Sequence, residues 1–265
     1  MKDNNQKIGN SILCEFDLEI QTAIITIDRE KQLNALNQEV ILSLEQAFDD
    51  ILKKPSIRSV ILTGSGKKAF VAGADIKEFE NFNTKQAQNL SERGKKRLFN
   101  KLTHFKKPVI SAINGYALGG GLELALSCHV RIASLDAKLG LPECTLGLIP
   151  GYSGTQKLPQ IISKNIAMEM ILTGKIIDAK EAYRIGLVNY VVATEDLLHK
   201  SKELAKSFKK TSPESLSAAI KSINMCYSNQ GEAVESEEFG KLFGTKNFKE
   251  GVGAFLEKRK PKFSS

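Results

Sequence analysis

The sequence has no tryptophan, and it contains only four cysteines and three histidines among its 265 residues. The cysteines lie far apart without a CxxC pair, and the histidines share no ligand spacing with them. This pattern argues against a disulfide framework and against a zinc site, so we expect no metal. No apolar run approaches the roughly 18 residues of a membrane helix. The first residues, MKDNNQKIGN, lack arginine and an apolar signal core, so we expect a cytoplasmic protein.

The charge is unbalanced, with a formal net charge of +8 and basic residues gathered between Lys246 and Lys262. Such a run is usually a solvated face, although it also suits a polyphosphate ligand or nucleic acid. Aromatic residues make up only 7% of the chain, and it carries no RNA-binding signature. Few stacking platforms are therefore present, which disfavours an RNA-binding protein.

Alternating strand and helix patterns occupy the first two thirds of the chain. Residues 22–27 and 59–64 are short, β-branched and apolar, and apolar residues recur at helical spacing between Val40 and Leu52. The same order returns as a helical stretch at 84–105, a strand at 108–113, a glycine turn, a helix at 120–128 and a strand at 130–134. From about Ser163 helical patterns dominate. We therefore expect an α/β core over residues 1–195, with a helical region over 196–265 packed on it.

Two glycine-rich turns are candidate ligand sites. FVAGAD, residues 70–75, follows a strand and places Gly73 among small residues, where backbone can approach a ligand closely. The triple glycine at 119–121 stands between a strand and a helix, whose first N–H groups have no intrahelical partner. An ordinary tight turn would explain either segment. The chain has no GxxxxGK[ST] or GxGxxG motif, which argues against a phosphate loop and a dinucleotide fold.

Two glutamates lie in otherwise apolar segments beside these turns. Glu123 falls on the first turn of the expected helix at 120–128, and Glu143 lies within LGLPECTLGLIPG. Each alone could be a capping or a buried hydrogen-bonded acid. Two carboxylates in one cavity cannot both ionise cheaply, so we expect one to act as an acid and the other as a base.

These motifs together carry a resemblance to a known family. FVAGADIKEF, KPVISAINGYALGGGLELALSC, KLGLPECTLGLIPGYSGTQKLP and the closing EGVGAFLEKRKPKF occur in the order and spacing of the enoyl-CoA hydratase (crotonase) family, over about residues 12–262. The chain most resembles its short-chain enoyl-CoA hydratases. The resemblance implies a crotonase-like spiral of ββα units, a helical carboxy-terminal trimerisation region, and a homotrimer or homohexamer. It also implies an acyl-CoA thioester substrate, whose coenzyme A replaces any separate cofactor.

The resemblance also assigns roles to residues. The backbone N–H groups of Ala74 and Gly120 would form an oxyanion hole for the thioester carbonyl. Glu123 would act on the water that adds at C3, Glu143 would exchange the proton at C2, and Gly151 would help to hold the water. The residues expected to bind substrate and coenzyme A are Ala72, Ala74, Asp75, Ile76, Lys77, Gly120 and Lys258.

The sequence departs from the family pattern at two places near the site. Lys157 stands where many members have arginine, and Tyr152 and Ser153 replace a more glycine-rich turn. We expect these changes to touch the rim of the site.

The predicted activity is the reversible hydration of a trans-2-enoyl-CoA to a 3-hydroxyacyl-CoA, as in fatty acid β-oxidation. Members with other reactions typically change one or both glutamates, so keeping both favours a hydratase. An enoyl-CoA isomerase or a branched-chain, methylglutaconyl-type hydratase is the alternative within the enzyme class.

Overall fold

The larger of two sheets is built from the β-branched, apolar segments of the sequence. The computed structural model describes residues 5–264. The strands, in spatial order, are β1 (Asn5–Ile8), β2 (Ile12–Asp17), β3 (Thr22–Ile27), β4 (Ser59–Gly64), β6 (Val109–Ile113), β8 (Val130–Ser134) and β11 (Tyr190–Val192). The pairs β1–β2 and β2–β3 are antiparallel, and the others are parallel. Parallel strands buried on both faces read as continuous apolar runs, which made β3, β4, β6 and β8 predictable.

A smaller sheet lies beside it and carries the loops of interest. Its order is β10 (Ile176–Asp178), β9 (Lys138–Gly140), β7 (Tyr116–Leu118) and β5 (Ala69–Val71). The chain repeatedly places one strand in the larger sheet, the next in the smaller sheet, and then a helix. This confirms the predicted α/β spiral of ββα units.

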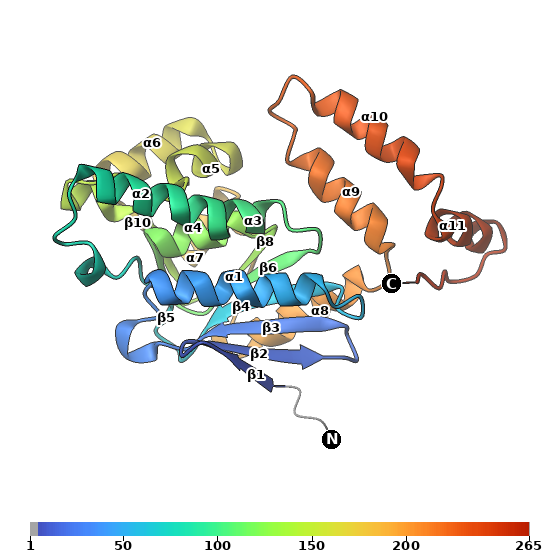
Figure 1. Cartoon of the computed structure of the whole chain (residues 1–265), viewed down its shortest axis with the longest axis horizontal. Coiled ribbons are helices and arrows are strands. Elements are labelled where there is room, and N and C mark those ends of the chain that lie inside the picture. The colour runs from blue at the N-terminus through green and yellow to red at the C-terminus, as the bar shows by residue number, and fades with distance from the viewer. Residues whose placement is uncertain (1–4, 265) are drawn as a thin grey trace.

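Helices pack between the sheets and on one face of the larger sheet. They are α1 (Gln38–Leu52), α2 (Thr84–Gly94), α3 (Asn100–Thr103) and α4 (Gly120–Ser127). The Asn37 side chain caps α1 by accepting a hydrogen bond from Val40 N at 2.9 Å. α1 lies against the larger sheet, with α2 and α3 beside it (Figure 1). A π-helical turn, Lys95–Phe99, joins α2 to α3, so the predicted helical stretch is continuous but not uniformly α-helical.

The opposite face of the larger sheet is covered by α8 (Leu197–Phe208). Leu197 and Ala205 of this helix are buried against Ile61 and Ile110, which point away from α1. The remaining helices of this part are α5 (Gly154–Ile161), α6 (Lys164–Thr173) and α7 (Ala179–Arg184), and short 3₁₀ turns occur at Glu30–Gln32, Ile76–Glu78, Pro142–Leu146 and Thr194–Asp196. β11 lies in the segment LVNYVV, and α8 follows it after the turn at Thr194–Asp196.

The last three helices stand apart from the layered body of the molecule (Figure 1). They are α9 (Pro213–Ile223), α10 (Gly231–Leu242) and α11 (Lys246–Leu256). The segment between α9 and α10 is linked to the body by two hydrogen bonds. Asn224 Nδ2 donates to Thr103 O at 2.6 Å, and Tyr227 Oη donates to Gln160 O at 3.0 Å. α11 begins at Lys246, so part of the basic segment between Lys246 and Lys262 is helical. Among residues 5–264, no helix has the length and apolar character needed to cross a membrane.

Candidate active site

Three neighbouring strand ends bring the sequence motifs together. β5, β7 and β9 are adjacent and parallel in the smaller sheet, so their carboxyl ends share one edge. Residues 72–75 follow β5, the triple glycine and α4 follow β7, and the turn Pro142–Leu146 follows β9. Both predicted glycine-rich turns and both predicted glutamates meet at this edge.

A cavity of about 260 Å³ opens at this edge. Glu123 and Glu143 line it together with Ala74, Gly120 and Gly151. Its apolar wall is formed by Phe79, Ala87, Leu90, Leu118, Leu146, Leu148 and Ile149. A mostly apolar cavity with a few convergent polar groups is typical of a small-molecule site.

The backbone around Ala74 directs its N–H group away from the neighbouring chain segment. Leu36 N donates to Gly73 O at 2.9 Å, and Asp75 N donates to Leu36 O at 2.7 Å. Because Leu36 bonds on both sides of Ala74, the Ala74 N–H points the other way. Gly120 is the first residue of α4, and a Cβ atom placed on it would lie 3.7 Å from Ala74 N. The two amides predicted for the oxyanion hole are therefore close together.

The triple glycine has a steric cause at two of its positions. A Cβ atom at Gly121 would lie 1.9 Å from Val71 O, so helix α4 can approach β5 only without a side chain there. Gly119 has a φ of 52°, and a Cβ atom at this residue would lie 2.9 Å from Glu143 Oε1. These glycines allow α4 and the Glu143 segment to close around the cavity.

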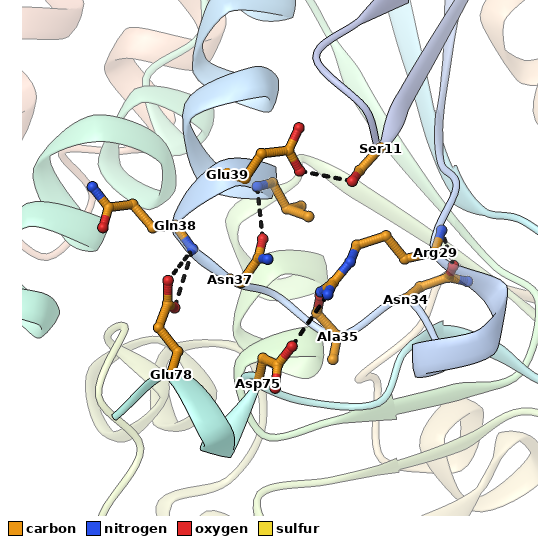
Figure 2. Close-up of polar contacts among 10 residues, drawn as sticks. Ser11, Arg29, Asn34, Ala35, Asn37, Gln38, Glu39, Asp75 and Glu78 are labelled. Carbon is orange, nitrogen blue, oxygen red and sulfur yellow. Dashed lines mark hydrogen bonds and ion pairs between the residues drawn. The ribbon is translucent and has the colours of Figure 1, made fainter. Parts of the chain in front are cut away.

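Polar contacts hold the segment that carries Ala74 (Figure 2). Arg29 donates from Nη1 to Ala35 O at 2.6 Å and from Nη2 to Asp75 Oδ2 at 3.2 Å. Glu78 accepts from Gln38 N through both carboxylate oxygens, at 2.9 and 3.1 Å, at the first turn of α1. Arg29 lies outside the sequence motifs, and Glu78 lies in FVAGADIKEF but was assigned no role, so the sequence did not predict either contact.

Glu123 is buried, with 1% of its surface exposed. Its Oε1 accepts hydrogen bonds from Tyr152 N and Gly154 N, each at 2.7 Å, while no described group donates to Oε2. Burial raises the pKa of Glu123 to about 7, and the charge of Glu143 acts in the same direction. The two amides and Lys157 favour the ionised form and oppose that rise. The carboxylate is thus fixed in position with one oxygen left for chemistry.

Glu143 lies in the Pro142–Leu146 turn and is half-buried. Burial raises the pKa of this carboxyl as well. Its Oε2 is buried and accepts no hydrogen bond from the described residues. Buried polar atoms without partners are rare and often mark a functional site. Two such oxygens line one cavity, and the acid and base roles expected of the two residues stay predictions.

Proteins of one known family are similar to this chain over most of its length. The family described as "Enoyl-CoA hydratase/isomerase" matches residues 19–265. The chain belongs to this family. It is 41% identical to the short-chain-enoyl-CoA hydratase of Clostridium acetobutylicum, covering 96% of this chain and 97% of that protein. It is 42% identical to the crotonyl-CoA hydratase of Syntrophomonas wolfei, covering 94% of this chain and 97% of that protein.

A solved structure of the enoyl-CoA hydratase/isomerase family has the same fold. The crystal structure of the enoyl-CoA hydratase from Bacillus anthracis superposes with a TM-score of 0.88 at 36% identity, covering 98% of this chain and 99% of that chain. The resemblance stated from the motifs is confirmed at the level of family and fold.

Several residues that the family resemblance assigned to coenzyme A lie around the cavity, and others lie outside it. Ala72 and Ile76 line the cavity, whereas Asp75 is paired with Arg29 and Lys77 is not part of the lining. Lys258 follows α11 and is exposed, away from the cavity within one chain. Gly151 lines the cavity and accepts a hydrogen bond from Ser91 Oγ at 2.6 Å. The coenzyme A and water-binding roles of these residues stay predictions.

The expectation that Lys157 touches the rim of the site is wrong. Its Nζ donates to Ser127 Oγ at 2.6 Å, and Ser127 lies one turn after Glu123 on α4. Lys157 is part of α5, whose first residue, Gly154, donates to Glu123. Tyr152, the other departure from the family pattern, lines the cavity and stacks on Phe99 with ring centroids 4.5 Å apart.

Proposed function

We propose that this protein is an enoyl-CoA hydratase, which adds water to a trans-2-enoyl-CoA and forms a 3-hydroxyacyl-CoA. The main support is the cavity in which Glu123 and Glu143 lie beside the amides of Ala74 and Gly120. Each carboxylate has a buried oxygen without a hydrogen-bond partner among residues 5–264. The hydratase names of the relatives from Clostridium acetobutylicum and Syntrophomonas wolfei point to the same activity.

The proposed reaction divides the work between the amides and the acids. As hydroxide adds at C3, charge develops on the thioester oxygen, and the two N–H groups stabilise that enolate by about 3 kcal/mol each. Glu123 takes one proton from water through Oε2, because Oε1 is held by Tyr152 N and Gly154 N. Glu143 in its protonated form gives a proton to C2. Exchange with solvent then restores both carboxyl groups.

Both glutamates have pKa values raised by burial, which suits this division. With a pKa of about 7, Glu123 is ionised in a substantial fraction of molecules near neutral pH and still basic enough to accept a proton. Ionised Glu123 favours the protonated form of Glu143 by like-charge repulsion. The small size of the cavity favours a short or medium acyl chain.

The coenzyme A moiety is proposed to lie along Ala72, Ile76 and Lys77. Lys258 of another subunit is proposed to contact one of its phosphates. The exposed apolar side chains of α9 to α11 support the proposed homotrimer or homohexamer, and residues 196–265 are proposed to serve that assembly. Within these residues α8 packs on the larger sheet, so only α9 to α11 are left to bind other copies. A cytoplasmic location remains part of the proposal.

The test is a spectrophotometric assay of crotonyl-CoA hydration. We expect loss of the enoyl-thioester absorbance and formation of 3-hydroxybutyryl-CoA. Conversion of a 3-enoyl-CoA without hydration of crotonyl-CoA would favour the isomerase, and conversion of only a branched enoyl-CoA would favour the branched-chain hydratase. A panel of enoyl chains of increasing length then measures the substrate range. A salt-sensitive gel shift with RNA, in the absence of any hydration, would point to nucleic-acid binding instead.

A further inference from the structure

The ammonium group of Lys157 is surrounded by three oxygen acceptors. Its Nζ lies 2.6 Å from Thr103 Oγ1, 2.6 Å from Ser127 Oγ and 3.3 Å from Phe99 O. A lysine ammonium has three N–H donors, so each donor has one acceptor here. The charged form of Lys157 is therefore fully hydrogen-bonded by groups from α3, α4 and the π-helical turn.

These contacts lead directly to Glu123. Ser127 Oγ donates to the backbone oxygen of Glu123 at 2.8 Å. On the same helix as Lys157, Gly154 N donates to Glu123 Oε1 at 2.7 Å. Lys157 thus ties α5, which supplies this donor, to α4, which carries the carboxylate.

We propose that Lys157 is a positioning residue for Glu123, which locks α4 against α5 and supplies the positive charge that favours the ionised carboxylate. Its role rests on the proposed action of Glu123 on water. Lys157 does not line the cavity, so it acts through Glu123 and not on the substrate.

The other titratable groups around Lys157 leave it as the cation that acts on Glu123. On the α4 side, burial raises the pKa of Cys128 to about 12, and burial lowers the pKa of the following residue, His129, to about 4. Both are therefore neutral at pH 7. The guanidinium of Arg131 on β8 donates to Leu187 O and Cys128 O, each at 2.8 Å, and not to Glu123. Glu143 can supply only negative charge to Glu123, and only while it is ionised.

Burial lowers the pKa of Lys157 to about 8, while Cys128 and Glu123 oppose this fall. The ammonium is therefore present at pH 7 and is lost as the pH rises through about 8. Its loss removes one donor from the three acceptors and the positive charge beside Glu123. We therefore expect activity to fall at low pH, where Glu123 is protonated, and at high pH, where Lys157 is deprotonated.

The first experiment measures the pH profile of kcat/KM on crotonyl-CoA for wild type, Lys157→Met, Lys157→Arg and the control Lys164→Met. Lys164 is an exposed lysine at the start of α6, so its replacement removes the same charge elsewhere. In Lys157→Met the acid limb moves to higher pH, which lowers the rate at pH 6 by about tenfold for each unit that the limb moves. Lys157→Arg keeps the acid limb and loses the alkaline decline near pH 8.

A second variant covers the case in which Lys157→Met does not fold. Ser127→Ala removes one acceptor of the ammonium and leaves Lys157 and Glu123 in place. The charged form of Lys157 is then less favoured, so the alkaline decline begins at lower pH. Acid and alkaline limbs that stay unchanged in folded Lys157→Met and Ser127→Ala would overturn the proposal, even if thermal stability fell.

A measurement on the free protein separates this proposal from the proposed function. With ¹³C-labelled glutamate carboxyl groups, the resonance missing from Glu123→Gln identifies Glu123, and its titration is followed by NMR. We expect its pKa to be higher in Lys157→Met than in wild type and unchanged in Lys157→Arg. A shift without any hydratase activity would refute only the function, and activity without a shift would refute only the role of Lys157.

Discussion

The edge of the smaller sheet and the carboxy-terminal helices differ in how completely contacts within one chain bury and hydrogen-bond their side chains. At the edge, Glu123 is buried and its Oε1 is held by two amides, and the glycines allow the segments to pack closely. In the carboxy-terminal helices, by contrast, Ile223, Phe255 and Leu256 are 67%, 81% and 73% exposed. Exposed apolar groups of this size usually mark an interface. The difference supports the proposals that the two glutamates act within one chain and that α9 to α11 bind further copies.

Substitution of the two glutamates at the sheet edge is expected to change activity more than any other variant that tests this comparison. Glu123→Gln and Glu143→Gln keep size and most hydrogen bonding but remove the acid–base capacity, so each lowers kcat for crotonyl-CoA by roughly 10²-fold to 10⁴-fold. The double variant loses less than the product of the single losses, because groups that act as one unit are not additive.

The control for both variants is Glu232→Gln, an exposed acid on α10. An isomerase would show another pattern, in which Glu143→Gln abolishes turnover of a 3-enoyl-CoA and Glu123→Gln leaves it largely intact. Hydration by Glu123→Gln at the wild-type rate would refute the two-glutamate mechanism.

The backbone donor at Gly120 is the second test of the sheet edge. Gly120→Pro removes the N–H but suits the first position of a helix, so the protein folds and turnover falls about 100-fold or more. Gly120→Ala is the matched control, because it keeps the N–H and its Cβ would make only ordinary contacts, the nearest at 3.5 Å from Tyr152 Cδ2. Equal turnover in the two folded variants would remove Gly120 from the oxyanion hole.

The raised pKa of Glu123 predicts a stability cost at the same edge. The folded-state pKa of about 7 exceeds the unfolded value of about 4.3, so the native state binds the proton more tightly and loses stability as the pH rises between these values. Glu123→Gln cannot ionise, so at pH 8 its free energy of unfolding should exceed that of wild type by about 4 kcal/mol. It should therefore unfold at a higher temperature than wild type. At pH 4 the two proteins should differ little. Thermal unfolding at both pH values measures this, and a Glu123→Gln protein that is less stable at pH 8 would contradict the buried charge.

A change at Lys258, which follows α11, is expected to give the smallest effect. If Lys258 contacts a phosphate of coenzyme A, Lys258→Ala raises KM about twofold to fivefold and leaves kcat almost unchanged, because exposed ion pairs contribute at most about 1 kcal/mol. Lys206→Ala, on an exposed position of α8, controls for the loss of one positive charge. An unchanged KM for crotonyl-CoA would mean that Lys258 is only solvated.

The sequence predicted the long elements well and the short ones poorly. The continuous apolar run of residues 59–64 and the helical spacing of apolar residues in 40–52 are both clear patterns, and both elements were confirmed. The strands of the smaller sheet have only three residues each, too few for any period to show. Helix α5 was not predicted, because it begins after Ser153, a residue with positive φ, and contains Pro159.

For the site, the residue types that carry charge were visible and the groups that position them were not. Glu123 and Glu143 stood out as acids in apolar surroundings, whereas Tyr152 and Gly154 act through backbone N–H groups that any residue would offer. Arg29 and Lys157 are linked to the site by contacts between segments distant in sequence. Such contacts follow from the fold and leave no local pattern.

The π-helical turn between α2 and α3 allows the length of the chain to vary at this point. A π-helical turn of this kind contains one residue more than the α-helical turn it replaces. Both kinds of turn complete one revolution, so deleting one residue from 95–99 would restore a regular helix and leave the orientation of α3 nearly unchanged. Thr103 would still face Lys157 and Asn224, which it now contacts. In evolutionary terms, a one-residue deletion should be tolerated at Lys95–Phe99.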